Sequence, residues 1–101
     1  MTIREQIDDS GQGERFDPGR IVVTPRATET LAWSVISQAV ERHTRGDWGE
    51  VWKDREQENE EALRRRGGRI FSIYSSSGAV KFCVISDTRR QITTVKLADE
   101  V

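Results

Sequence analysis

The stretch from His43 to Trp52, HTRGDWGEVW, holds a denser group of chemically versatile residues than any other part of the chain. It contains the only histidine, His43, then Asp47 and two tryptophans, Trp48 and Trp52. A histidine can exchange a proton near neutral pH, and a nearby carboxylate can orient its imidazole ring. The stretch is therefore either a reactive site or a turn surrounded by aromatic packing.

The spacing favours a turn between two helices. Two glycines bracket the stretch and allow backbone angles that other residues resist, and the aspartate can accept hydrogen bonds from amides of its own turn. The tryptophans can seal the corner against the core, and the histidine falls at the end of the first helix, where its ring can complete that core. The residues that we assign to this structural turn are Gly46, Asp47, Trp48, Gly49 and Trp52.

No other part of the sequence matches a reactive pattern. Cys83, the only cysteine, sits within an apolar run and is expected to be buried and inert. One histidine and one cysteine are too few for the usual zinc sites, and no glycine-rich phosphate-binding motif occurs. The sequence therefore predicts a protein that is not an enzyme and that holds no cofactor or metal ion.

Composition narrows the class of protein further. The chain has 101 residues, of which 35% are hydrophobic and 33% charged, as in one small domain. Its net charge of -1 gives no overall attraction to nucleic acid or to membranes. No apolar run is long enough for a membrane span or a signal peptide, so we expect a cytoplasmic protein without a membrane partner. Residues 1–19 are expected to form a flexible tail, and residues 20–101 a single domain.

The ordered elements are expected to begin with a short strand. Residues Ile21–Val23 are β-branched and are typical of a strand at the edge of a sheet. Thr24 can cap a helix, and Pro25 is suited to its first turn. Apolar residues at helical spacing then predict one helix from Pro25 to about His43.

A second helix is predicted to begin at Asp54, which can act as its cap, and to end at Gly67 and Gly68. Its apolar stripe is thin, so it should cover one edge of the core. Asn59 lies on that stripe and is a candidate for a semi-buried hydrogen bond to a loop or strand. We therefore group Asn59 with the structural turn.

The last third of the chain predicts three strands. They are the runs RIFSIYS, AVKFCVI and QITTVKL, separated by two turns. The middle run is apolar on both alternating faces, as expected for a central strand. The predicted fold is α+β: two helices packed on a three-stranded antiparallel meander, with or without the N-terminal edge strand, in the order β-α-α-β-β-β.

Arginines gather at two places that this fold can bring together. One group stands at the junction between the second helix and the first strand, and the other stands in the turn that follows the middle strand. The start of one antiparallel strand lies beside the end of the next, so the groups can form one basic patch beside an aromatic residue. The residues that we assign to this candidate partner surface are Arg64, Arg65, Arg66, Arg69, Arg89, Arg90 and Tyr74.

Residues of the predicted domain carry a resemblance to a known family. Between about Ile21 and Val95 the chain resembles small proteins of bacterial plasmids, integrated elements and phages, labelled plasmid-related or, in some cases, type I restriction subunit. The resemblance lies in the Gly46–Gly49 turn, in Asn59, in Gly68 and Arg69, and in residues 90–94. The sequence departs from the family pattern at Cys83, at residues 88–90 and in the closing KLADEV.

The resemblance implies a mobile-element accessory protein with no catalytic role. Such proteins commonly bind a macromolecule of the host or of the element, and an inhibitor of a host defence system is one form. Our leading expectation is a non-enzymatic module that binds another protein. The alternative is an accessory nucleic-acid-binding protein that uses the arginine patch. A third hypothesis is an enzyme of unrecognised type, which would need a concave pocket that joins His43 with Asp47 or with another carboxylate.

Overall fold

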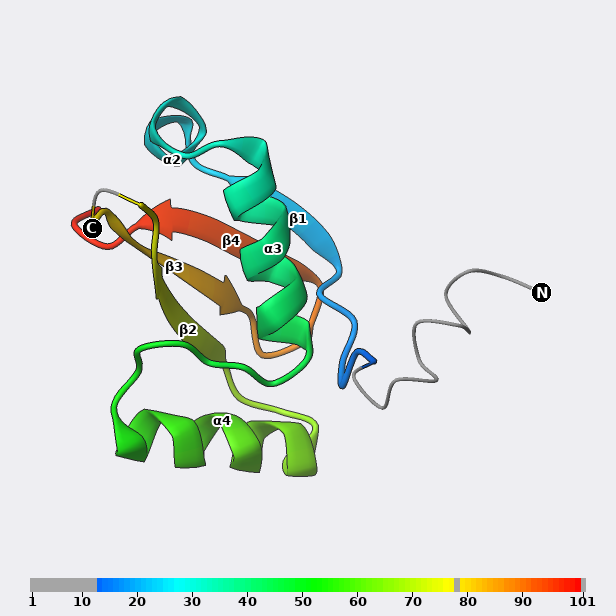
Figure 1. Ribbon diagram of the computed structural model, residues 1–101. Helices are drawn as coiled ribbons and strands as arrows, with labels where there is room; N and C mark the ends of the chain where they lie inside the picture. The colour runs from blue at the N-terminus through cyan, green and yellow to red at the C-terminus, as the bar shows by residue number, and fades with distance from the viewer. Residues whose placement is uncertain (1–12, 78, 101) are drawn as a thin grey trace.

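The computed structural model describes residues 13–77 and 79–100, which form an α+β arrangement of three helices and a four-stranded mixed sheet (Figure 1). The strand order across the sheet is β1-β4-β3-β2. The elements in chain order are β1 (Arg20–Val23), α2 (Pro25–Thr30), α3 (Trp33–Thr44), α4 (Lys53–Arg65), β2 (Ile70–Ser75), β3 (Lys81–Ser86) and β4 (Ile92–Leu97).

The sheet contains the predicted meander and one added strand. β2 pairs antiparallel with β3, and β3 pairs antiparallel with β4. β1 joins the far side of β4 in parallel, with Arg20 beside Ile92 and Val23 beside Val95. The two edges of the sheet are therefore β1 and β2.

The core is divided between the covered face of the sheet and the space beneath α4. The larger cluster lies between α2, α3 and the sheet and includes Ile36, Tyr74, Phe82, Val84 and Val95. The smaller one consists of Trp48, Val51, Ala62 and Ile70. In Figure 1, α3 crosses one face of the sheet and α4 lies alongside β2.

The single helix predicted from Pro25 to His43 is wrong, because the chain forms two helices there. Thr24 caps α2 by accepting a hydrogen bond from the Ala27 amide, and the backbone is then extended at Leu31 and at Ala32 before α3 begins. A continuous 19-residue helix would be about 28 Å long, whereas a six-residue strand spans only about 20 Å. The break lets α2 cover the end of the sheet while α3 crosses it.

The second helix also differs at its ends. α4 begins at Lys53, and Trp52 occupies its N-cap position without a side-chain hydrogen bond. Asp54 therefore lies in the first turn, where its negative charge favours the helix dipole, and is not the cap. At the other end the left-handed residue that stops the helix is Arg66, with φ 59°, and not the expected glycine pair.

Asn59 closes the outer edge of β2. Its side chain is fully buried, its Nδ2 donates to the Phe71 carbonyl at 2.9 Å, and its Oδ1 accepts from the Phe71 amide at 3.0 Å. The same oxygen accepts hydrogen bonds from the Arg55 guanidinium. Ile73 lies two residues after Phe71 on β2, and its backbone N–H and C=O groups form hydrogen bonds with the loop before α4. The side-chain amide thus takes the place of a neighbouring strand.

We predict that Asn59→Ala lowers the free energy of unfolding by about 2 to 4 kcal/mol, because the N–H and C=O groups of Phe71 lose their partner in a buried position. Gln57→Ala, an exposed change on the same helix, should cost less than about 0.5 kcal/mol. Urea denaturation followed by circular dichroism measures both. Equal stability of the two variants would show that the amide does not close this edge.

Candidate functional site

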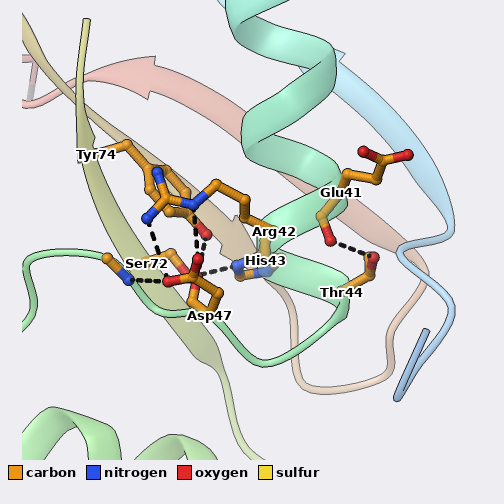
Figure 2. A network of polar contacts seen from close by, with 8 residues as sticks. Glu41, Arg42, His43, Thr44, Asp47, Ser72 and Tyr74 are labelled. Atoms are coloured by element: carbon orange, nitrogen blue, oxygen red, sulfur yellow. Dashed lines mark hydrogen bonds and ion pairs between the residues drawn. The ribbon is translucent and has the colours of Figure 1, made fainter. Parts of the chain in front are cut away.

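The turn after α3 is held by Asp47 and Arg42 (Figure 2). The Asp47 carboxylate accepts from Arg42 at 2.7 and 3.2 Å and from the Gly49 amide at 3.3 Å. The hydrogen bonds from Arg42 are the main reason that the pKa of Asp47 is lowered. Tyr74 donates its hydroxyl to the Asp47 carbonyl at 2.7 Å, beneath the Arg42 guanidinium. The carboxylate is therefore engaged by an arginine and does not pair with His43.

Gly49 lets this turn lie against β2. It has φ +72° and forms a parallel bridge with Ile73, whose carbonyl oxygen occupies the space that a Cβ at Gly49 would need. Trp48 is buried, and its indole donates to Glu60 at 3.2 Å. The turn therefore serves as an additional edge segment of the sheet.

Trp52 was expected to seal the same corner, and that expectation is wrong. Its side chain is 57% exposed, and its ring lies 6.4 Å from that of Phe71. The reason is that residue 52 is the cap of α4, where the chain turns outward, while Val51 supplies the buried apolar group.

His43 lies at the centre of a buried chain of hydrogen bonds. Its Nδ1 is 2.6 Å from Ser72 Oγ, and its Nε2 is 2.9 Å from Ser86 Oγ. Ser86 in turn contacts Thr93 Oγ1 at 2.6 Å, and Thr93 donates to the Pro18 carbonyl at 2.6 Å. All four side chains are fully buried.

The Pro18 carbonyl fixes the direction of the whole chain, because a carbonyl can only accept. Thr93 uses its one proton on Pro18, so Ser86 must donate to Thr93 and must accept from His43. His43 is therefore the neutral Nε2–H tautomer, and its Nδ1 accepts the proton of Ser72. None of the three hydroxyl protons is left unpaired.

This environment suppresses the acid–base chemistry of His43. Burial, followed by the positive charge of Arg90, lowers the pKa of His43 to about 3. Phe16 packs edge-on against the imidazole at 5.3 Å, and Trp48 does so at 5.9 Å. The ring has no open face for a substrate, and we assign it a structural role.

Residues 13–19, called here the N-terminal strap, cover this buried chain. The backbone amide of Arg15 donates to the Thr44 carbonyl, and its guanidinium donates two hydrogen bonds to the Glu60 carboxylate, at 2.7 and 3.0 Å. Phe16 lies between His43 and the guanidinium of Arg90. The sequence placed the start of order at residue 20. In the structure, order begins at Arg15 at the latest, because the Phe16 side chain and the Arg15–Glu60 ion pair hold the strap in place. Residues 1–12 lie outside the described ones.

The two arginine groups do meet, but one member serves the fold. Arg90 donates to the carbonyls of Gly68 at 2.6 Å and Ala62 at 3.2 Å, which ties the turn before β4 to the end of α4. Tyr74 is only 2% exposed, so its place on a partner surface is wrong; it points inward beneath Arg42. The exposed members of the expected patch are Arg64, Arg65, Arg66, Arg69 and Arg89.

A larger candidate surface is the face of the sheet opposite α3, called here the open face. The register places these side chains on it: Val22, Phe71, Ile73, Cys83, Ile85, Ile92, Thr94 and Lys96. The described helices α2 and α3 lie on the other face, and α4 lies along β2 (Figure 1), where Phe71 and Ile73 pack against the cluster beneath it. Cys83 at its centre is buried among these neighbours, and burial raises the pKa of its thiol.

The open face carries a shallow hollow of about 380 Å³ over β3 and β4. Its floor is apolar, with Ile85 and the 40% exposed Ile92, and Arg69 and Lys96 stand at its rim. Asp87 also lines it, but its Oδ1 already accepts from the Gln91 and Ile92 amides. Sequence reasoning did not select this surface, although the alternation in the strands indicates which side chains share it.

Comparison with known proteins matched no family model, no curated protein and no solved structure. Within residues 13–77 and 79–100, no cluster of histidine, cysteine and acidic side chains is arranged to hold a metal ion. None of the helices described in those ranges has the length and apolar character needed to cross a membrane.

We predict that acid destabilises the protein through His43. Its pKa is about 3 in the folded chain and near 6.5 when unfolded, so the unfolded state binds the proton first as the pH falls. Stability should be level above about pH 6.5 and fall by about 2 kcal/mol between pH 6.5 and 5. Urea denaturation at each pH measures this, and the decline should be absent in His43→Gln between pH 7 and 5. An unchanged decline in that variant would contradict the assignment.

Proposed function

We propose that this protein is a non-enzymatic module that binds another protein through the open face of its sheet. The observation that carries the proposal is the part of the open face over β3 and β4, which no described helix covers. Its hollow is lined by Ile85 and Ile92 together with Arg69 and Lys96. Sheets in two- and three-layer folds bury their apolar faces against helices. A partner can supply the missing layer.

The partner that fits is an amphipathic helix with an apolar stripe between carboxylates. Each six-residue strand spans about 20 Å, which matches about four helical turns. Arg69 and Lys96 form no ion pair with any described residue, so they favour a partner helix whose apolar stripe is flanked by acidic residues. Lys81, by contrast, is already paired with Glu50 at 2.7 Å. Charge complementarity of this kind steers association and sets the orientation of the partner.

The aliphatic floor of the hollow favours protein over nucleic acid. Single-stranded nucleic acids bind sheets by stacking their bases on aromatic rings, and Ile85 and Ile92 offer none. The alternative function, accessory nucleic-acid binding, is supported by five exposed arginines around the end of α4. Several glutamates of α4 line a hollow together with Arg64 and weaken the positive field there.

The resemblance to small proteins of bacterial plasmids and phages fits an accessory protein of this type. A role as an inhibitor of a host defence system would be one use of such a module. The open face then serves as the surface that engages the host protein, and cytoplasmic action remains our prediction.

Synthetic helices test the proposal directly. We predict that fluorescein-labelled peptides with a leucine stripe flanked by glutamates bind the full chain, and that matched peptides flanked by lysines do not. Lys96→Glu should weaken binding of the acidic peptides about tenfold, because it replaces an attraction with a repulsion at the rim. Arg64→Glu, the same charge change on α4, should alter it less than twofold. Fluorescence anisotropy gives the affinities.

A labelled oligothymidylate and a labelled duplex serve as the competing probes. Nucleic-acid binding that Arg64→Glu weakens and Lys96→Glu leaves intact would establish the alternative function in place of the proposed one. Absence of peptide binding, or equal binding of acidic and basic peptides, would overturn the proposal.

A further inference from the structure

The outer edge of β1 presents backbone groups that no described residue pairs with. The amides of Arg20 and Thr24 donate to the carbonyls of Gln91 and Val95 across the β1–β4 pair. The backbone groups of successive residues on a strand point alternately to its two sides. The N–H and C=O groups of Ile21 and Val23 therefore point away from the sheet. Two N–H groups and two C=O groups are thereby left at this edge.

The two edges of the sheet are treated differently by the sequence. At β2 the backbone is closed by the amide of Asn59 and by the turn around Gly49. At β1 the described chain supplies neither a side-chain amide nor a second turn, and Ile21 is 39% exposed. An edge of this kind accepts another extended strand.

The sequence of β1 is complementary to itself in an antiparallel register. When two copies meet edge to edge, Ile21 of each copy can form a hydrogen-bonded pair with Val23 of the other, which uses all four outward groups of both strands. Val22 then lies opposite the same residue of the second copy, on the two-fold axis. Every central cross-strand pair is aliphatic, a combination that stabilises sheets.

The same register avoids repulsion between like charges. Arg20 lies opposite Thr24 of the other copy and not opposite another arginine. A strand from an unrelated protein would satisfy the backbone groups equally well, but nothing in β1 selects its side chains. The aliphatic and charge matching selects a second copy of this chain.

We propose that β1 is a homodimerisation edge, at which two copies pair antiparallel around Val22 and join their sheets into one eight-stranded sheet. The dimer has closed two-fold symmetry, the commonest symmetry of soluble oligomers. It places the two open faces side by side on the same surface, without covering either hollow. The proposal rests on the backbone of the edge and does not depend on what the open face binds.

The short edge predicts a weak dimer, present at protein concentrations of about 0.1 mM and largely dissociated at about 1 µM. Sedimentation equilibrium of the full chain measures this. Ile21→Pro removes one outward N–H while the amides that bond β4 stay in place, and should weaken the dimer at least tenfold. Trp52→Ala is the control, because this 57% exposed side chain lies at the start of α4, beside the opposite edge of the sheet, and the change should leave the dimer intact.

Cross-linking gives a readout that does not depend on the stability of the variants. Val22→Cys places two thiols across the two-fold axis at a non-hydrogen-bonded pair, where Cβ atoms are close enough for a disulfide. Oxidised glutathione should convert this variant to a covalent dimer at least tenfold faster than Ile92→Cys, and the wild type, whose Cys83 is buried, sets the background. Equal rates for the two variants, or a wild-type mass that stays monomeric at about 0.5 mM, would overturn the proposal.

Discussion

A single neutral imidazole joins the parts of this protein that are far apart in sequence. His43, at the end of α3, accepts from Ser72 on β2 and donates to Ser86 on β3, and the chain of hydroxyls continues through Thr93 on β4 to the carbonyl of Pro18. Each hydrogen bond adds only about 1 kcal/mol, but a buried group left without its partner costs about 1 to 3 kcal/mol. The helix, the three antiparallel strands and the N-terminal strap must therefore be in place together.

This use of the polar residues decides where function can reside. His43 is enclosed, the carboxylate of Asp47 is held by Arg42, and Arg90 is occupied by backbone carbonyls. The groups that first suggested chemistry thus stabilise the fold. What the described residues leave unused is backbone and apolar surface: the open face of the sheet and the outer edge of β1. We propose binding roles for both, and they adjoin at Val22, which belongs to β1 and projects from the open face.

Local pattern was sufficient for the strands, for the glycine turn and for Asn59, because each has a signal within a few residues: alternation, a pair of glycines, a polar residue on an apolar stripe. It failed where distant contacts decide. The sequence around Leu31 has no strong helix breaker, yet the chain is extended there and Leu31 is buried in the core. Phe16 falls in the stretch predicted to be a flexible tail, and its contacts with His43 and Arg90 are distant in sequence. The alternation in β2 showed which side chains share a face with Tyr74, but it did not show which face of the sheet α3 would cover.

The state of the His43 ring tests the central claim, that the only histidine is a structural bridge whose proton is fixed by the Pro18 carbonyl. Nitrogen-15 NMR of the side chain distinguishes its two tautomers and its charged form. We expect a neutral ring with the proton on Nε2, slow exchange of that proton with solvent, and no titration between pH 5 and 8. A ring that titrates near pH 6.5, or that carries its proton on Nδ1, would contradict the account and would return His43 to the candidates for chemistry.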